Sequence, residues 1–213
     1  MDFIDSSINE YAEAHSKPES ELLARLNRET HTKVLAPRML SGHLQGRILA
    51  MFAKMLQPKN ILEIGTYTGY SAICLAEGLD SGGKIYTVDI NEELEDIARR
   101  YFEEAGIAQQ VDFRIGNALE IIPTLDVTFD LVFIDADKIS YAQYFDMVID
   151  KMAKNGIIIA DNVLWSGKVA QEISKQDKDT LAIDNFNKKV HADDRVENVL
   201  FPVRDGLMIL RKK

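Results

Sequence analysis

The sequence has little cysteine, no excess of positive charge and no long hydrophobic run, and each shortage excludes a class of protein. The single cysteine, Cys74, cannot form an intrachain disulfide, which favours a cytoplasmic protein. Lys and Arg number 25 against 34 Asp and Glu, a formal charge of −9, so non-specific binding to nucleic acid or to anionic membranes is not expected. No apolar run approaches the roughly 20 residues of a membrane-spanning helix. The opening MDFIDSSINE lacks the basic and then apolar segments of a secretory signal.

What is present is typical of one globular domain covering 1–213. Of the 213 residues, 46% are apolar, which is enough to bury a single core. The spacing of apolar residues predicts helices through the first 58 residues, with a helix over 41–56 between Pro37 and Pro58. One face of that helix carries Leu44, Ile48, Met51, Phe52 and Met55.

After Pro58, short apolar runs alternate with helical stretches. The runs cover 60–64, 84–89, 111–115, 129–135 and 156–161, and the last helical stretch between them covers 141–156. Such alternation predicts a doubly wound α/β fold, with a parallel sheet covered by helices on both faces. At the end of the chain, 195–203 and 206–211 flank an Arg-Asp-Gly turn, which predicts an antiparallel hairpin.

Ligands of such sheets bind beyond the carboxyl ends of the strands, so the residues found there deserve inspection. Most of them are polar or glycine. They are 63–69, Asp89, 116–118, 135–138, Asp161 and Asn162.

The first of these strand ends is a glycine turn, EIGTYTGYS at 63–71. Its spacing is G-x-x-x-G, whereas the dinucleotide fingerprint is G-x-G-x-x-G, and Tyr67 stands where the second glycine would be. Glu63 would be unfavourable beside a pyrophosphate but suits a cationic ligand. With Asp89 placed to accept hydrogen bonds from a ribose, the pattern favours S-adenosylmethionine (SAM). The simpler alternative is an ordinary tight turn with a solvated aspartate.

The second strand-end cluster comes from FDLVFIDADK at 129–138 and from ADN at 160–162. Asp135, Asp161 and Asn162 offer oxygen ligands, which suit Mg²⁺, Mn²⁺ or Ca²⁺ better than zinc. A surface ion-pair network is the alternative interpretation. The D-x-D motif of phosphatases that form an aspartyl-phosphate fits poorly, because here it follows three strands and lacks the expected Thr or Val.

Taken in order, EIGTYTGYS, VDIN, GNALEIIP, FIDADK and ADNVLWSGKV resemble the cation-dependent class I O-methyltransferases of the caffeoyl-CoA and catechol O-methyltransferase type. The resemblance runs from about residue 35 to the end of the chain. It implies a Rossmann-like seven-stranded sheet of order 3-2-1-4-5-7-6 with strand seven antiparallel. It also implies helices before the sheet that form part of the active-site cover, and a homodimer.

The resemblance further implies roles for individual residues. Asp135, Asp161 and Asn162 would bind the divalent metal, with Mg²⁺ favoured. Lys138 would be the general base for a substrate hydroxyl, and Trp165 would help line the acceptor pocket.

The remaining implied residues would hold SAM. The methionine moiety would lie against Glu63, Gly65, Tyr70 and Ser71, with Met39 and Ser41 closing over it. Asp89 would bind the ribose, Ile90, Gly116 and Ala118 would frame the adenine, and Asp135 and Asp137 would lie beside the cofactor.

We therefore expect an enzyme that transfers a methyl group from SAM to a hydroxyl of a catechol-like, vicinal dihydroxy aromatic substrate. Two alternatives remain open from the residues: a nicotinamide-dependent oxidoreductase and a nucleoside-binding protein without catalysis. The segments 1–38 and 163–182, which would face the acceptor, match the family least, so the acceptor itself is not predicted.

Overall fold

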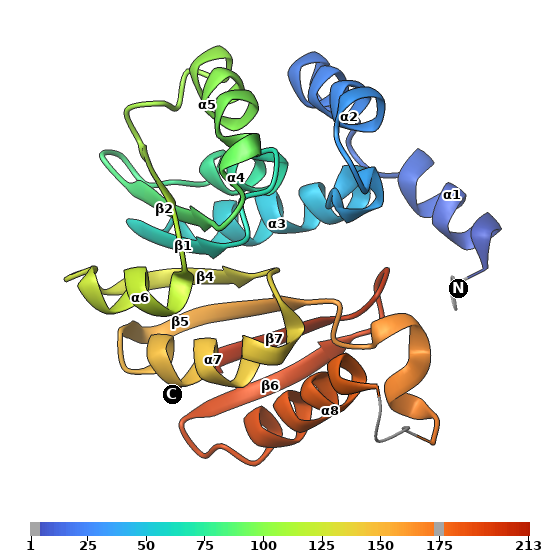
Figure 1. Cartoon of the computed structure of the whole chain (residues 1–213), viewed down its shortest axis with the longest axis vertical. Helices are drawn as coiled ribbons and strands as arrows, with labels where there is room; N and C mark the ends of the chain where they lie inside the picture. The colour runs from blue at the N-terminus through green and yellow to red at the C-terminus, as the bar shows by residue number, and fades with distance from the viewer. Residues whose placement is uncertain (1–4, 173–176) are drawn as a thin grey trace.

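The computed structural model describes residues 5–172 and 177–213, and these form one seven-stranded sheet with helices on both faces (Figure 1). The strand order is β3-β2-β1-β4-β5-β7-β6, and β7 is antiparallel to both of its neighbours. This confirms the predicted fold class, order and hairpin. The strands are β1 (Asn60–Ile64), β2 (Lys84–Asp89), β3 (Val111–Ile115), β4 (Phe129–Ile134), β5 (Met152–Asp161), β6 (Val196–Phe201) and β7 (Leu207–Lys212).

Helices follow most of the parallel strands, as the alternating pattern predicts. They are α1 (Ser6–Ala14), α2 (Glu21–Lys33), α3 (Gly42–Leu56), α4 (Tyr70–Ala76), α5 (Glu95–Glu104), α6 (Ala118–Ile121), α7 (Tyr141–Ile149) and α8 (Lys178–His191). No helix in the described part of the chain is long and apolar enough to cross a membrane.

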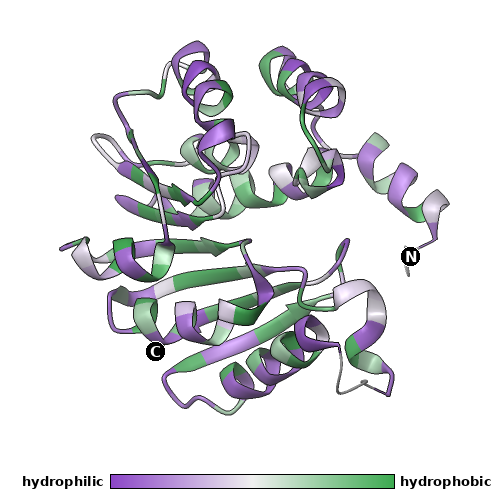
Figure 2. Ribbon diagram, viewed as in Figure 1, coloured by the Kyte–Doolittle hydropathy of each residue, from purple (hydrophilic) through white to green (hydrophobic). Residues whose placement is uncertain are grey.

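The core has two halves, one on each side of the sheet. In β4, Leu131 and Phe133 pack with α2 to α5, whereas Val132 and Ile134 pack with α6 to α8. Successive strand residues point to opposite faces, so a strand buried on both sides must be apolar throughout. Figure 2 shows this as hydrophobic colour along β4 and β5, with hydrophilic stripes on the outer helices.

Two predicted boundaries were wrong. The helix expected over 141–156 ends at Ile149, because β5 already begins at Met152. The strand expected over 129–135 ends at Ile134. The helix α8 was not predicted, and its first residue, Lys178, lies within the segment 163–182 that was expected to face the acceptor.

The apolar face expected on α3 is not its buried face. Met51 and Met55 are 60% and 74% exposed. The helix instead buries small residues against α4: a Cβ on Gly46 would lie 2.7 Å from the ring of Tyr70. Close approach of the two helices therefore decides which side of α3 faces inward.

Candidate active site

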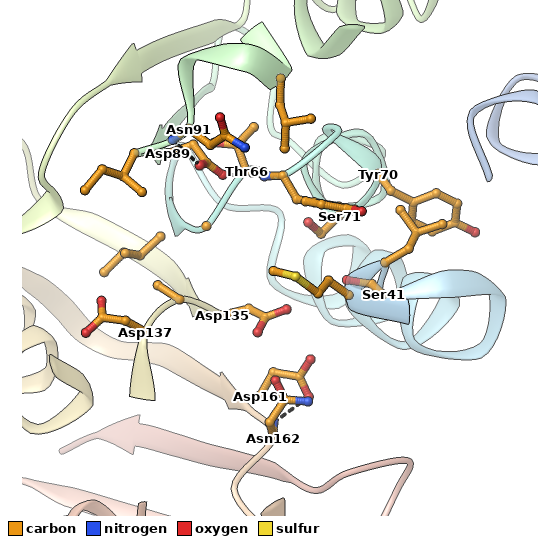
Figure 3. Close-up of a pocket in the computed structure, with 18 of the residues that line it drawn as sticks. Ser41, Thr66, Tyr70, Ser71, Asp89, Asn91, Asp135, Asp137, Asp161 and Asn162 are labelled. Atoms are coloured by element: carbon orange, nitrogen blue, oxygen red, sulfur yellow. Dashed lines mark hydrogen bonds between the residues drawn. The ribbon is translucent and has the colours of Figure 1, made fainter. Parts of the chain in front are cut away.

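The sheet register brings the predicted site residues to one edge. Ile64 of β1 is paired with Ile134 of β4, which is paired with Ala160 of β5. The residues that follow are Gly65, Asp135 and Asp161, so they lie side by side at the carboxyl ends of the strands. A cleft of about 1990 Å³ opens there (Figure 3).

Of the predicted site residues, all but Glu63 line this cleft. They are Met39, Ser41, Gly65, Tyr70, Ser71, Asp89, Ile90, Gly116, Ala118, Asp135, Asp137, Lys138, Asp161, Asn162 and Trp165.

The glycine turn needs its first glycine for a close contact. Gly65 has φ +102°, and a Cβ built on it would lie 2.0 Å from the carbonyl oxygen of Asp135. No side chain can occupy that space, so the absence of a Cβ lets the turn after β1 lie directly against the end of β4. This contact joins the glycine turn to the carboxylate cluster.

Asp89 is held at the end of β2 by two backbone amides. The N–H of Tyr67 donates to its Oδ2 at 2.6 Å, and the N–H of Asn91 donates to its Oδ1 at 2.9 Å. Each carboxylate oxygen keeps a further lone pair, so Asp89 can also accept hydrogen bonds from a ligand in the cleft. Figure 3 shows Asp89 and Asn91 together at this side of the cleft.

Glu63 lies fully buried beneath the glycine turn. Its Oε2 accepts a 2.5 Å hydrogen bond from the Thr87 hydroxyl, which is 2.6 Å from the hydroxyl of Thr66. The other oxygen, Oε1, has no partner among the described residues. Burial raises the pKa of Glu63 to about 8. A buried carboxyl group with a vacant acceptor is suited to a cationic group of a ligand above it.

Large apolar side chains also stand exposed around the cleft. Leu35 is 89% exposed, Met39 60%, Ile90 77% and Ile139 61%. Exposed apolar surface in a concave site is typical of ligand-binding clefts, because a bound ligand removes it from water.

Lys138 lies at the centre of the carboxylate cluster. Its Nζ donates to Asp135 Oδ1 at 3.1 Å, to Asn162 Oδ1 at 2.8 Å and to the Tyr141 hydroxyl at 2.6 Å. The ammonium group therefore uses all three of its N–H groups. Nζ also lies 5.8 Å from the ring centroid of Trp165.

Asp161 is buried at the end of β5 and held from two sides. The N–H of Asn162 donates to its Oδ1 at 2.7 Å, and Nε2 of Gln45 donates to its Oδ2 at 2.6 Å. Burial, followed by repulsion from Asp135, raises the pKa of Asp161 above its usual range. Gln45 was not predicted as a site residue, because its only signal is a polar residue on the buried face of α3.

The oxygens in this cluster suit a hard divalent cation. Asp135 and Asn162 each place an oxygen within 3.1 Å of one positive charge, the Lys138 ammonium. Asp161 adds a buried carboxylate beside them. Within residues 5–172 and 177–213, no three His, Cys, Asp or Glu side chains gather as a metal site, so this set reaches three ligands only with the Asn162 amide. Such an all-oxygen set fits Mg²⁺, Mn²⁺ or Ca²⁺.

Two of the predicted residues, Asp137 and Tyr70, have structural contacts of their own. Asp137 accepts a hydrogen bond from the Ser140 N–H at 3.1 Å and another from the Tyr144 hydroxyl at 2.5 Å. The bond from Ser140 makes Asp137 the N-cap of the 3-10 helix Lys138–Ser140, which carries Lys138. The Tyr70 hydroxyl donates to Glu19.

Comparison with known proteins identifies the chain. A family model described as O-methyltransferase matches residues 13–213. The chain belongs to the O-methyltransferase family. This confirms the resemblance seen in the sequence motifs.

Curated relatives are similar over most of the chain. The caffeoyl-CoA O-methyltransferase of Petroselinum crispum is 37% identical over 179 residues, which are 79% of this chain and 74% of that protein. Caffeoyl-CoA O-methyltransferase 1 of Arabidopsis thaliana is 37% identical over 181 residues, 79% of this chain and 69% of that protein.

Solved structures agree with the fold. The methyltransferase PaMTH1 of Podospora anserina, in its SAH-bound form, superposes with a TM-score of 0.89 at 30% identity, covering 98% of this chain and 94% of that one. The Bacillus cereus O-methyltransferase in complex with SAH gives 0.89 at 30% identity, covering 97% of both chains.

Proposed function

We propose that this protein transfers a methyl group from SAM to one hydroxyl of a catechol-type acceptor, with a divalent cation held at the carboxylate cluster. The observation that carries the proposal is the meeting of Asp135, Lys138, Asp161 and Asn162 in the same cleft as the glycine turn. A SAM-binding turn alone would suit many methyltransferases. The second cluster beside it points to a reaction at a hydroxyl group.

The glycine-turn side of the cleft would bind SAM. The SAH-bound relatives support this cofactor. Gly65, Tyr70 and Ser71 would face the positively charged methionine end, with Glu63 buried beneath them, and Asp89 would accept from the ribose hydroxyls. The exposed Ile90, with Gly116 and Ala118, would pack against the adenine, while Met39 and Ser41 at the start of α3 would cover the methionine end.

The cation would be held by Asp135, Asp161 and Asn162, with Asp137 close by. A bound divalent cation would supply positive charge that makes the acceptor hydroxyl more acidic. Mg²⁺ is the first candidate, since about six oxygen ligands can be completed by water and by the two oxygens of a catechol.

Lys138 would accept the proton of the acceptor hydroxyl. In the structure it donates to three acceptors, which describes the protonated amine. Asp135 and Asn162 are two of the three, so their engagement with a cation would release Lys138, and positive charge nearby would favour its neutral form. Bound SAM would supply the methyl group, and transfer of that group from sulfur to the acceptor oxygen would leave SAH as the product. Trp165 would lie beside the aromatic ring of the acceptor.

Two other functions fit the chain less well. A nicotinamide-dependent oxidoreductase would use the G-x-G-x-x-G turn, which is replaced here by G-x-x-x-G with Tyr67 at φ +49°. A nucleoside-binding protein without catalysis has no use for Lys138 among two carboxylates.

The test is methyl transfer from labelled SAM to a panel of catechols, with Mg²⁺ and then with EDTA. We expect transfer that EDTA abolishes and Mg²⁺ restores. Transfer that EDTA leaves unchanged would refute the role of the carboxylate cluster. Binding of NAD in place of SAM would favour the oxidoreductase, and SAM binding with no transfer to any catechol would favour the binding protein.

We also propose a homodimer, as in the family resemblance. The exposed apolar side chains of α3, Met51 and Met55, support it because one turn of helix presents both to solvent. The molar mass from light scattering should be twice that of the 24.0 kDa chain. Met55→Glu should lower that mass with little change in Tm, whereas an unchanged mass would exclude this helix face from the interface.

A further inference from the structure

A chain of hydrogen bonds runs from the hairpin turn between β6 and β7, through α3, to the end of β5. Arg204 Nη1 donates to Gln45 Oε1 at 3.1 Å, and Gln45 Nε2 donates to Asp161 Oδ2 at 2.6 Å. Gln45 is 1% exposed and Asp161 3% exposed, so their contact is shielded from water. We infer that Gln45 and Arg204 are positioning residues that fix the Asp161 carboxylate for cation binding. This inference rests on the metal site of the proposed function.

The role of Arg204 follows from the chemistry of an amide. A glutamine side chain has a donor end and an acceptor end of nearly the same shape, so it can face a neighbour in either sense. A guanidinium can only donate, so Arg204 takes the oxygen end of Gln45 and leaves the NH₂ end for Asp161. The reverse orientation would set two donors face to face at Arg204 and an amide oxygen against the Asp161 carboxylate.

The backbone of Arg204 gives a second reason to regard it as functional. Its φ is +50°, in the left-handed region where a residue with a Cβ is less stable than glycine. Arg204 Nη2 also lies 3.5 Å from the carbonyl oxygen of Leu40, which directs the side chain across to the start of α3. The contacts of its side chain with Gln45 and Leu40 explain why an arginine is found in this backbone conformation.

The same chain of contacts joins the two sides of the cleft. Gln45 lies one turn beyond Ser41, which we place over the methionine end of SAM, while Asp161 belongs to the cation cluster. The contact between α3 and β5 is therefore made by the Gln45 NH₂ group, which Arg204 keeps turned toward Asp161. We expect a substitution of Gln45 or Arg204 to change cation affinity more than it changes the fold.

The experiment is Mn²⁺ binding to the full chain, followed by electron paramagnetic resonance, with Tm measured on each sample. For Arg204→Gly we expect binding about tenfold weaker than wild type, since residues that orient metal ligands typically contribute 10- to 100-fold to affinity. Its Tm should stay close to wild type, because the tolerance of glycine for the backbone conformation offsets the loss of the hydrogen bond to Gln45. Arg204→Lys keeps a group that can only donate and should retain most of the affinity.

Two further variants complete the test. Gln45→Leu should weaken Mn²⁺ binding as Arg204→Gly does. Arg38→Ala removes another exposed positive charge that lines the cleft and should leave Mn²⁺ binding unchanged.

Three results would overturn the inference. If Arg204→Gly binds Mn²⁺ as tightly as wild type, Arg204 does not position Asp161, although the metal site itself is retained. Equal weakening in Arg38→Ala would mean that the loss of affinity is not specific to the contacts of Arg204 with Gln45. A wild-type chain that binds no Mn²⁺ would refute both this inference and the metal site of the proposed function.

Discussion

The two halves of the cleft are built in different ways. On the cofactor side, the tight backbone at the strand ends is made mainly by glycines, such as Gly65 at φ +102° and Gly69 at φ +88°. On the side proposed for the acceptor, Gly167 and Gly206 are joined by four residues with side chains in the left-handed region: Asn162, Trp165, Ser166 and Arg204, with φ between +47° and +58°.

This difference has a physical meaning. Left-handed backbone is free of cost for glycine, but costs of order 1 kcal/mol or more per residue when a Cβ is present. The cofactor side therefore holds fewer such conformations, with Tyr67 at φ +49° in the glycine turn. The acceptor side holds less stable conformations that place Asn162, Trp165 and Arg204 at the cleft, so we expect mutations there to separate stability from activity.

The largest effect should come from adding one carbon to the cofactor side. Gly65→Ala places a Cβ where the Asp135 carbonyl oxygen lies, 2.0 Å away, so β1 and β4 must separate. We expect a loss of more than about 3 kcal/mol in the free energy of unfolding. Urea denaturation measures it. Gly82→Ala is the control, since Gly82 also has positive φ but nothing within 4 Å, and should lose only about 1 kcal/mol. Equal losses of unfolding free energy in the two variants would show that the contact with Asp135 does not destabilise Gly65→Ala.

On the acceptor side, Lys138→Met should abolish turnover without unfolding the chain. Loss of a general base lowers kcat by about 10² to 10⁴. SAM affinity, measured by calorimetry, should stay within a few-fold of wild type because the cofactor side is intact. Lys138→Arg keeps the positive charge but cannot accept a proton, so it should be as inactive as Lys138→Met. Normal turnover in either variant would rule out the base role.

Asp161→Asn should sharpen the contrast between stability and function. It removes a buried carboxylate that Asp135 repels, so the free energy of unfolding should be unchanged or higher. Cation affinity should fall by at least about tenfold, because a charged ligand is lost. Mn²⁺ titration and thermal melts on the same samples test both. A fall in stability together with unchanged Mn²⁺ affinity would contradict the assignment.

The effect expected from Glu63→Gln differs from the others because it depends on pH. The pKa of Glu63 rises from 4.5 to about 8 on folding, so between these values the folded state binds the extra proton and stability falls as pH increases. Glutamine cannot titrate, so this part of the decline should disappear. Without cofactor, the Tm of Glu63→Gln relative to wild type should be higher at pH 9 than at pH 6. An equal difference at both pH values would show that Glu63 is not protonated in the fold.

The sequence predicted the sheet well because each of its signals is local. A strand buried on both faces must be apolar along its length, and β4 and β5 meet that condition through Phe129, Ile134 and Ile158. Strand-end polarity then located Asp135, Asp161 and Asn162, since parallel strands end at one edge.

What the sequence could not predict depends on contacts between distant residues. Gln45 is separated from Asp161 by 116 residues and from Arg204 by 159, and no local pattern links them. The buried face of α3 was likewise decided by its closeness to α4, which allows Gly46 inside and leaves Met51 outside. The helix α8, Lys178–His191, was not predicted at all.

The loop after β5 and the hairpin turn before β7 are fastened to each other. The Leu164 N–H donates to the Asp205 carbonyl oxygen at 2.9 Å, and the Ser166 N–H donates to the Asp205 carboxylate at 2.5 Å. In a redesign of acceptor preference, the two loops should be treated as one unit. A library that randomises 162–168 alone keeps the original hairpin turn as its partner, whereas transplanting both segments from one donor enzyme keeps their contacts matched.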